Sequence, residues 1–509
     1  MVTESRSNAA FAWGFDLAAV IAGAGLALAF APIDLWWLSP LSLLGLIYLI
    51  ADTTGRRAVW RGWLFGVGLF GVGVSWVSES FQYNHIAYSV ALSLTTAFVL
   101  FLALFPALAV WLARRLSSGR GYPLGLSLAG AWVLLEWGRG EFLTGFTWLQ
   151  LGYSQLGSPL AGYAPVFGTL GMSLLLGLSV VGVVFILERY RRSGIQAFAA
   201  TVVIASLWLG GVFLKTVQWT SPAGPPIAVA LVQGNVSQDK KWRADQRIPT
   251  LRLYTEHTRR NWNADLVVWP ETAVPAFYRQ ASRFLAGLGD EAKANQTELL
   301  VGLPVQGDDG PHNSVYHVGT QTFYHKRHLV PFGEYLPLDG IIRPLAEAAG
   351  IPVPSFRHGA WTQPLFSING VPMAMMICYE VAFGDEVASH LPSAQVLLSV
   401  SNDAWFGDSL APHQHLQMAQ MRALETGRHL ARATNTGISA FIGPDGALRS
   451  QTEQFTETVL TDTVVPMSGA TPYTKWRDIP ALIASALLLG GCCVRARRVR
   501  SNGGSHDRG

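Results

Sequence analysis

Apolar and polar positions are distributed very unevenly along this chain of 509 residues. From about Phe11 to Leu214, long apolar runs of roughly 17–25 residues follow one another, the length that an α-helix needs to cross a bilayer. A last apolar run, from Ile479 to Val494, is short and crosses a bilayer only if its Tyr473–Trp476 flank lies at the interface. We expect the other membrane-spanning helices near residues 12–30, 35–50, 60–78, 88–112, 124–138, 166–187 and 197–214.

The segment from about Pro222 to Ser468 has a different pattern, with short apolar runs in mixed polar sequence. Helical patterns occur at 248–261, 284–295 and 415–433, and in the last of these Arg422, Glu425 and Arg428 are spaced to share one face. The alternation of runs and helices predicts a layered α/β domain whose strand ends carry its chemistry. Buried strands are expected at 227–232, 266–269, 299–303, 321–325, 373–377 and 396–400.

These patterns predict a multi-pass α-helical membrane domain joined to an α/β domain. Hydrophobic residues make up 50% of the chain and charged residues 14%, which is too apolar for an average soluble protein. The net charge of +4 is modest and its basic residues form short clusters, so nucleic-acid binding is disfavoured. The expected boundaries are a seven-helix transmembrane region at 1–221, the α/β domain at 222–468, a final transmembrane helix at 469–494 and a basic tail at 495–509.

Arginine clusters predict the orientation of the chain in the membrane. They occupy every second loop between the expected spans, whereas loop 78–88 has no basic residue except a histidine and loop 139–165 has only Arg139. Because basic loops favour the cytoplasm, we expect both termini inside and the α/β domain outside. The alternative, that these loops are merely solvated, does not predict strict alternation. The clusters are Arg56, Arg57 and Arg61; Arg114, Arg115 and Arg120; Arg189, Arg191 and Arg192; and Arg495, Arg497, Arg498 and Arg500.

Three polar residues stand at the ends of three predicted strands: Glu271, Lys326 and Cys378. If those strands are neighbours, the three side chains converge at one rim. A thiolate is a nucleophile, a nearby carboxylate can take the thiol proton, and an ammonium group stabilises the thiolate and then an oxyanion. Together they indicate acyl transfer through a thioester.

Each of these residues also has a structural interpretation. A cysteine after an apolar strand is most often a small buried hydrophobe. Glu271 is alternatively a cap of a helix that begins at Thr272, and Lys326, beside Arg327, a solvated strand end. Spacing alone leaves these alternatives open.

The remaining thiols and histidines suggest little chemistry. Cys492 and Cys493 are adjacent near the expected cytoplasmic end of the last span, where packing is favoured over acylation, and three thiols make no disulfide framework. His413 and His415 do not share a helix face, and no cysteine or carboxylate set completes a metal site around them. We therefore expect neither a metal nor another cofactor.

The expected spans hold few special positions. The glycine-rich stretch GVGLFGVGVSW at 66–76 lies in an apolar run and predicts close helix packing, not a phosphate-binding loop. Asp16 and Glu136 are isolated charges, and they do not make a transport pathway.

Several longer motifs carry a family resemblance. VVWPETAVP (267–275), YHKRHLVPFGEYLP (324–337) and ICYEVAFGD (377–385) resemble the three motifs of the nitrilase, or carbon–nitrogen hydrolase, superfamily. Taken with the spans, the chain resembles the bacterial apolipoprotein N-acyltransferase family over nearly its whole length. The further motifs are SNDAWFGDSLAPHQH (401–415), RATNTGISAFIGPDG (432–446) and FLTGFTWLQLGYSQ (142–155), the last with Thr147 where the family pattern has proline.

The resemblance implies a four-layer α-β-β-α sandwich and a triad in which Glu271 is the base, Lys326 the oxyanion stabiliser and Cys378 the nucleophile. The supporting residues that it implies are Glu334 near the triad, Tyr379 and Glu380 after the nucleophile, and Trp242 on a loop over the site.

The reaction implied is the last step of lipoprotein maturation. A fatty acyl chain would pass from the sn-1 position of a membrane phospholipid, expected to be phosphatidylethanolamine, to the α-amine of an apolipoprotein's diacylglyceryl-cysteine, through a thioester. The implied location is the bacterial cytoplasmic (inner) membrane with the catalytic domain in the periplasm, which agrees with the arginine pattern. Loops near Phe332–Pro337 and Phe356–Phe366 would dip towards lipid or serve the core.

Two functions of other classes compete with this interpretation. A membrane-anchored amidase would use the same triad with water as acceptor. A non-catalytic transporter or assembly scaffold would need no triad at all.

Overall fold

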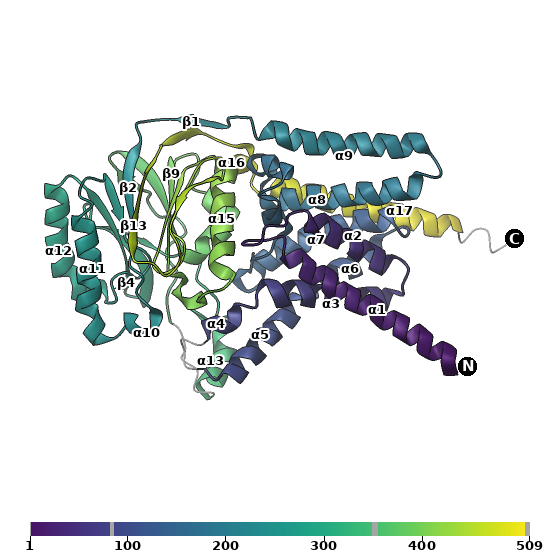
Figure 1. The fold of residues 1–509 in the computed structure, drawn as a ribbon, viewed down its shortest axis with the longest axis horizontal. Coiled ribbons are helices and arrows are strands. Elements are labelled where there is room, and N and C mark those ends of the chain that lie inside the picture. Colours follow the sequence, from purple (N-terminus) through teal and green to yellow (C-terminus); the bar gives the residue numbers. More distant parts are fainter. Residues whose placement is uncertain (1, 82–85, 349–354, 504–509) are drawn as a thin grey trace. The chain divides into compact units, whose positions relative to one another are not determined.

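The computed structural model describes residues 2–81, 86–348 and 355–503 (Figure 1). The chain forms two compact units: one of residues 1–78, 89–217 and 476–509, and one of residues 79–88 and 218–475. The first holds the long apolar helices, and the second holds the strands of both large sheets.

The first unit is helical, and every range predicted as a span overlaps one of its helices or, at 88–112, two of them. Among the described residues, four stretches are long and apolar enough to cross a membrane: 88–116, 159–189, 194–214 and 479–499. The helices are α1 (Val2–Ala27), α2 (Leu38–Ala51), α3 (Gly55–Gly73), α5 (Tyr88–Leu102), α6 (Leu104–Leu116), α7 (Tyr122–Glu141), α8 (Ala164–Arg189), α9 (Gly194–Leu214) and α17 (Ile479–Gly503), and α4 (Val77–Ser80) joins the two units.

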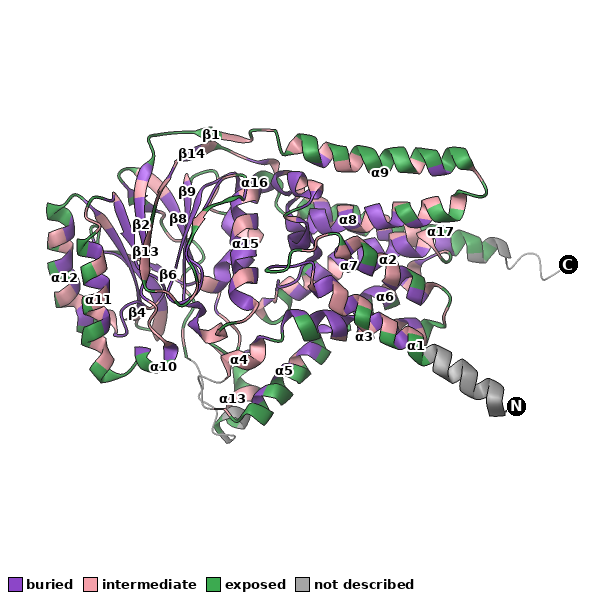
Figure 2. Ribbon diagram, viewed as in Figure 1, coloured by how far each residue is buried: buried purple, intermediate pink, exposed green. Residues whose placement is uncertain are grey.

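Helix α9 shows the surface expected of a helix that faces lipid. Ala197 and Gly211 are its buried residues, and most of its large apolar side chains are exposed (Figure 2). Ile195 is 80% exposed and Phe198 69% exposed. Burying such a surface in hydrocarbon removes a large unfavourable contact with water.

The glycine-rich run in α3 packs closely against neighbouring helices. A Cβ atom on Gly68 would stand 2.1 Å from the carbonyl oxygen of Val20 in α1, and one on Gly66 would stand 2.6 Å from Cα of Ala103. No side chain fits at either position. The predicted packing role is confirmed.

The isolated charges of this unit are held in structural contacts. Asp16 pairs with Arg57, and its Oδ1 atom lies 3.1 Å from Nε of Arg61. Glu136 accepts hydrogen bonds from Nε1 of Trp132 at 2.9 Å and from the Leu151 N–H at 2.8 Å. These contacts engage the Asp16 carboxylate and the Oε1 atom of Glu136, whereas Oε2 of Glu136 has no hydrogen-bond partner among the described residues.

One departure from the family pattern lies in this unit. Thr147 is buried, and its hydroxyl oxygen has no hydrogen-bond partner among the described residues. Nothing in the structure explains why threonine stands here.

The second unit contains two six-stranded sheets. Their orders are β13-β2-β3-β4-β5-β6 and β12-β11-β10-β9-β8-β7. The first sheet consists of β2 (Ile227–Gln233), β3 (Leu266–Val268), β4 (Glu298–Gln306), β5 (Pro311–His317), β6 (Thr322–His325) and β13 (Thr458–Val464). The second consists of β7 (Phe366–Ile368), β8 (Val371–Ile377), β9 (Val396–Ser401), β10 (Leu430–Thr434), β11 (Ala440–Ile442) and β12 (Leu448–Gln451).

Successive side chains of a strand point to opposite faces of its sheet, so each strand packs against two layers. In β2, Val229 and Leu231 pack between the two sheets, whereas Ala230 and Val232 face the helices α11 (Arg247–Arg259) and α12 (Tyr278–Ala294). Helix α15 (Ala411–Thr426) contacts β10 and β11 of the second sheet. Since most strands are covered on both faces, they are continuously apolar in sequence. The α-β-β-α sandwich is confirmed.

The predicted helix at 415–433 is wrong after Thr426. Helix α15 ends at Thr426 because Gly427 takes a left-handed conformation with φ +63°, and residues 430–434 form β10, paired in parallel with β9. Arg422 and Glu425 do form an ion pair of 3.0 Å. Arg428 lies beyond the helix end and donates instead to the Ala394 carbonyl.

The two ends of the long segment of this unit, residues 218–475, lie side by side. Strand β1 (Thr220–Pro222) pairs antiparallel with β14 (Met467–Gly469). Short α16 (Pro472–Trp476) then precedes α17.

Candidate active site

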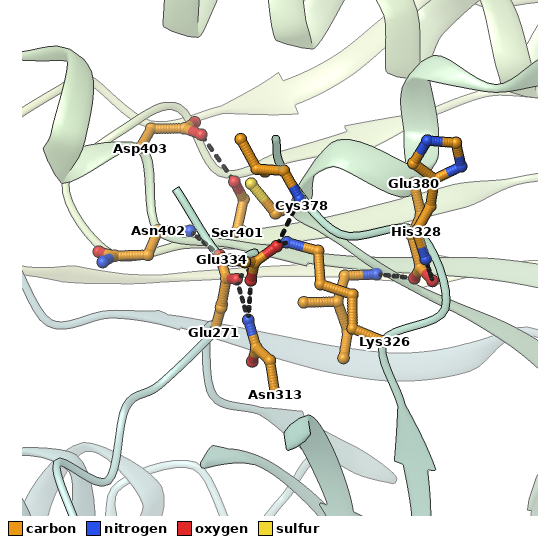
Figure 3. Close-up of polar contacts among 12 residues, drawn as sticks. Glu271, Asn313, Lys326, His328, Glu334, Cys378, Glu380, Ser401, Asn402 and Asp403 are labelled. Carbon is orange, nitrogen blue, oxygen red and sulfur yellow. Dashed lines mark hydrogen bonds and ion pairs between the residues drawn. The ribbon is translucent and has the colours of Figure 1, made fainter. Parts of the chain in front are cut away.

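The three residues that follow predicted strands meet at one rim of the sandwich. Glu271 lies in the loop after β3, Lys326 directly after β6, and Cys378 directly after β8. Strand β3 is parallel to β4, whereas β5 is antiparallel to both β4 and β6. Strands β3 and β6 therefore run in the same direction, and Glu271 and Lys326, which follow them, lie at the same edge of the first sheet. Cys378 reaches them from the second sheet (Figure 3).

Glu271 is a buried carboxylate fixed by two donors. Its Oε1 atom accepts from Nδ2 of Asn313 at 2.6 Å, and its Oε2 atom accepts from the Asn402 N–H at 2.8 Å. Gly302 lets the loop that holds Glu271 lie close to β4, because a Cβ atom on residue 302 would stand 2.2 Å from the Pro270 carbonyl oxygen. No helix begins at Thr272, so the capping interpretation of Glu271 is wrong.

Lys326 is buried between two carboxylates, which excludes the solvated interpretation. Its Nζ atom lies 2.8 Å from Oε2 of Glu334 and 3.6 Å from Oε1 of Glu271. Burial alone would lower the pKa of Lys326, but the Glu334 and Glu271 charges outweigh it and raise the pKa above its usual range. Asn313 also donates to Glu334, at 2.8 Å. The ammonium is therefore a fixed positive charge.

Cys378 has the backbone of a residue held in a sharp turn. Its φ of +52° lies in the left-handed region, where a non-glycine residue is strained. This turn ends β8 and starts the 3-10 helix Cys378–Ala382, and the side chain is half-buried. Burial and the Glu271 carboxylate raise the pKa of the thiol, while Lys326 opposes them. At neutral pH the sulfur is therefore a thiol that needs a base.

The raised pKa of Cys378 predicts how its alkylation depends on pH. In a Cys492→Ala/Cys493→Ala background, the rate of reaction with iodoacetamide should still rise above pH ~9, where an ordinary thiol of pKa about 8.5 is levelling off. The direction of this effect follows from the fraction of thiolate, because a raised pKa lowers that fraction at every pH below the pKa. Mass spectrometry of the labelled peptide measures the rate. A plateau below pH ~8 would instead mean a resting thiolate–ammonium pair.

Glu380 ties the two sheets together behind the triad. It accepts from the Ile377 N–H at 2.6 Å, just before Cys378, and from the Arg327 N–H at 2.7 Å, just after Lys326. The Tyr324 hydroxyl donates to it at 3.0 Å. Burial raises the pKa of Glu380, although the Ile377 N–H and Arg327 oppose this. One carboxylate thus fixes the spacing between Lys326 and Cys378.

The loop that carries Trp242 is joined to the site through its neighbour. Short helix α10 (Gln238–Lys241) ends in a buried lysine, whose Nζ atom donates to the Glu271 carbonyl at 3.2 Å. Burial lowers the pKa of Lys241 to about 7, although the nearby Glu271 carboxylate acts to raise it. Trp242 itself is 51% exposed. The loop therefore combines an anchor beside Glu271 with an exposed aromatic ring.

Comparisons with known proteins agree with both halves of the chain. The family model for the apolipoprotein N-acyltransferase N-terminal domain matches residues 22–182, and the carbon-nitrogen hydrolase model matches residues 228–473. The apolipoprotein N-acyltransferase of Methylococcus capsulatus is 44% identical over 502 residues, covering 96% of this chain and 97% of that protein. That of Azotobacter vinelandii is 43% identical over 500 residues, covering 96% of each.

The chain belongs to the apolipoprotein N-acyltransferase family. It is an N-acyltransferase with a carbon–nitrogen hydrolase domain, embedded in a bacterial membrane. Among solved structures, the NitFhit protein of C. elegans shows a weak likeness, with a TM-score of 0.38 and 15% identity over 52% of this chain and 65% of that one.

Sequence reasoning missed several residues of this N-acyltransferase site. Asn402 and Asp403 directly follow β9, so the rule that found the triad would also have found them. Asn313 lies within β5 and reaches Glu271 only through sheet pairing, which leaves no sequence signal. His415, considered only as a metal ligand, bonds to the Cys378 carbonyl. Among the described residues, no group of three or more potential ligands is arranged to hold a metal ion.

The loops expected to dip towards lipid or to serve the core hold both exposed and buried apolar residues. Phe332 and Trp361 are 58% and 68% exposed, whereas Leu336 and Phe366 are buried. Each loop therefore uses one apolar residue as an anchor and presents another at the surface.

Proposed function

We propose that this N-acyltransferase moves a fatty acyl chain from the sn-1 position of a membrane phospholipid to the α-amine of an apolipoprotein's diacylglyceryl-cysteine. A thioester on Cys378 would be the intermediate. The observation that supports this most is the convergence of a thiol, a buried carboxylate and a fixed ammonium group in a chain of this family. Phosphatidylethanolamine is the proposed donor.

In the first half-reaction, Glu271 takes the thiol proton as Sγ of Cys378 attacks the ester carbonyl carbon. A C–S bond forms, and the carbonyl electron pair moves to the oxygen, which is held by Lys326 and by backbone N–H groups after Cys378. The C–O bond to glycerol then breaks, and the leaving oxygen takes the proton back from Glu271. Lysophospholipid departs and the acyl thioester remains.

In the second half-reaction, the neutral α-amine attacks the thioester carbonyl. Glu271 takes a proton from the nitrogen, the C–S bond breaks, and the departing sulfur recovers that proton. Since an amide is more stable than a thioester, this half runs downhill. The exposed apolar residues Phe332 and Trp361 are proposed to help acyl chains, and not water, reach the thioester.

We also propose that the catalytic unit lies in the periplasm, with both termini in the cytoplasm. The arginine-rich loops support this orientation, since they alternate along the helical unit. A single cysteine introduced at exposed Ile248 in a Cys492→Ala/Cys493→Ala background should react with an impermeant maleimide in intact spheroplasts. Reaction only after lysis would place the unit in the cytoplasm.

The intermediate can be tested by mass spectrometry. Purified protein incubated with phosphatidylethanolamine alone should gain one fatty acyl group on Cys378, and hydroxylamine should remove it. Adding a diacylated lipopeptide should then discharge the acyl group as triacylated peptide. Phospholipid labelled separately at sn-1 and sn-2 identifies the position used.

The same experiment separates the amidase alternative. Free fatty acid without triacylated peptide would mean that water is the acceptor. A protein that never carries an acyl group would contradict the proposed mechanism as a whole.

A further inference from the structure

A buried polar cluster lies directly behind the nucleophile. It consists of Asp403, after β9, His415 of α15 and Arg432 of β10, and each is at most 2% exposed. Nη2 of Arg432 lies 2.9 Å from Oδ2 of Asp403 and 2.9 Å from Nδ1 of His415. Nε2 of His415 lies 3.0 Å from the Cys378 carbonyl oxygen. The cluster thus contacts the nucleophile through its backbone.

The partners of His415 decide which ring nitrogen carries the proton. A carbonyl oxygen only accepts, so the Nε2 atom facing Cys378 must be the donor. The Nδ1 atom lies between Nη2 of Arg432, a donor at 2.9 Å, and Oδ1 of Asp403, an acceptor at 3.1 Å, so these two contacts alone do not fix its proton. Burial and the Arg432 charge lower the pKa of His415, although Asp403 opposes them. The ring is therefore a neutral imidazole in its Nε2–H form.

Asp403 makes this arrangement possible. Burial raises its pKa, but Arg432 and hydrogen bonds outweigh burial and hold the pKa well below its usual range. The carboxylate neutralises Arg432 and also accepts from the Ser401 hydroxyl at 2.6 Å, and Ser401 in turn contacts the Cys378 thiol. An unpaired guanidinium would be costly at this depth.

We propose that His415 is a positioning residue for acyl transfer: its Nε2–H holds the Cys378 carbonyl and so keeps the nucleophile in its left-handed turn. The turn directs Sγ and the following N–H groups, and a strained conformation persists only where its surroundings fix it. Asp403 and Arg432 act through His415 by holding the Nδ1 side of its ring. This inference rests on the proposed role of Cys378 as nucleophile.

Two amides of different length test the proposal. In His415→Gln, the side-chain nitrogen reaches about as far as Nε2 of histidine and can donate to the Cys378 carbonyl. In His415→Asn it stops one atom short. We expect the Asn variant to form acyl-enzyme ~30–100-fold more slowly with KM for phospholipid nearly unchanged, since a misplacement of about 1 Å costs this much. The Gln variant should recover most of that loss.

His317→Asn is the matched control. His317 is fully buried in β5, and its Nδ1 atom accepts from the Thr320 N–H at 3.1 Å. Its loss should lower the thermal midpoint of the purified protein much as His415→Asn does, yet leave the acylation rate within ~3-fold. Single-turnover mass spectrometry of Cys378 measures the rate, and both variants are compared at a temperature where each is folded.

Three results would overturn the inference. A His415→Asn enzyme that acylates at the wild-type rate would show that the contact does not position the nucleophile. Equal losses in the Asn and Gln variants would show that the site needs an imidazole for another reason. Wild-type protein that forms no acyl-enzyme would overturn the proposed function and this inference together, whereas a normal wild type with an unaffected Asn variant would overturn the inference alone.

Discussion

Cys378→Ala is expected to abolish formation of triacylated lipopeptide, with a loss of at least ~10⁴-fold. The alanine side chain has no group that can form the thioester, and Glu271 and Lys326 alone offer no alternative nucleophile. The fold should survive, because Cys378 is half-buried at a turn and alanine removes only one sulfur. The measurement is conversion of a labelled diacylated peptide by purified enzyme in phospholipid micelles.

The two remaining cysteines provide the control. Cys492 and Cys493 are half-buried in α17, and the double variant Cys492→Ala/Cys493→Ala should retain nearly full activity. If Cys378→Ala still produced triacylated peptide at more than a few per cent of the wild-type rate, the nucleophile would have to be a different group.

Lys326→Met is expected to lower both activity and stability. Methionine fills similar space but leaves Glu271 and Glu334 without the ammonium that lies 3.6 Å and 2.8 Å from them. Losing one partner of a buried charge cluster costs about 3–5 kcal/mol of unfolding free energy. Losing an oxyanion partner lowers turnover by ~10³-fold. Chemical denaturation and single-turnover acylation measure the two effects separately.

A second substitution separates the two roles of the lysine. In Lys326→Met/Glu334→Gln one of the two like charges is gone, so much of the lost stability should return. Activity should stay low, because the oxyanion still has no cation. Recovery of activity together with stability would show that Lys326 has a purely structural role.

The helices and most strands of this chain could be predicted from the sequence, for a simple reason. Membrane spans and strands covered on both faces are continuous apolar runs, so burial is a local property of the sequence in β2, β3, β8 and β9. The predicted helix at 415–433 is too long because most residues of both 411–426 and 430–434 are buried, so the apolar pattern shows no boundary between them. The boundary is the left-handed turn at Gly427, which depends on backbone geometry.

The candidate site could be predicted only in part. Glu271, Lys326 and Cys378 stand after strands, where a local rule finds them, and motif resemblance added Glu334 and Glu380. Asn313 could not be found in this way, because its partners are 42 and 21 residues away. The role of His415 could not be found either, because its contact with the Cys378 carbonyl joins residues that are 37 positions apart.

Local sequence was enough to establish which segments are apolar enough for a membrane, which strands are buried, and which three residue types stand at the strand ends. Contacts between distant segments were needed to establish that these residues meet across two sheets, that Lys326 lies between two carboxylates, and that the His415 imidazole contacts the Cys378 carbonyl. The reason is that hydrophobicity and strand ends are local properties of the chain, whereas charge pairing, tautomer and backbone strain arise only when distant segments are brought together.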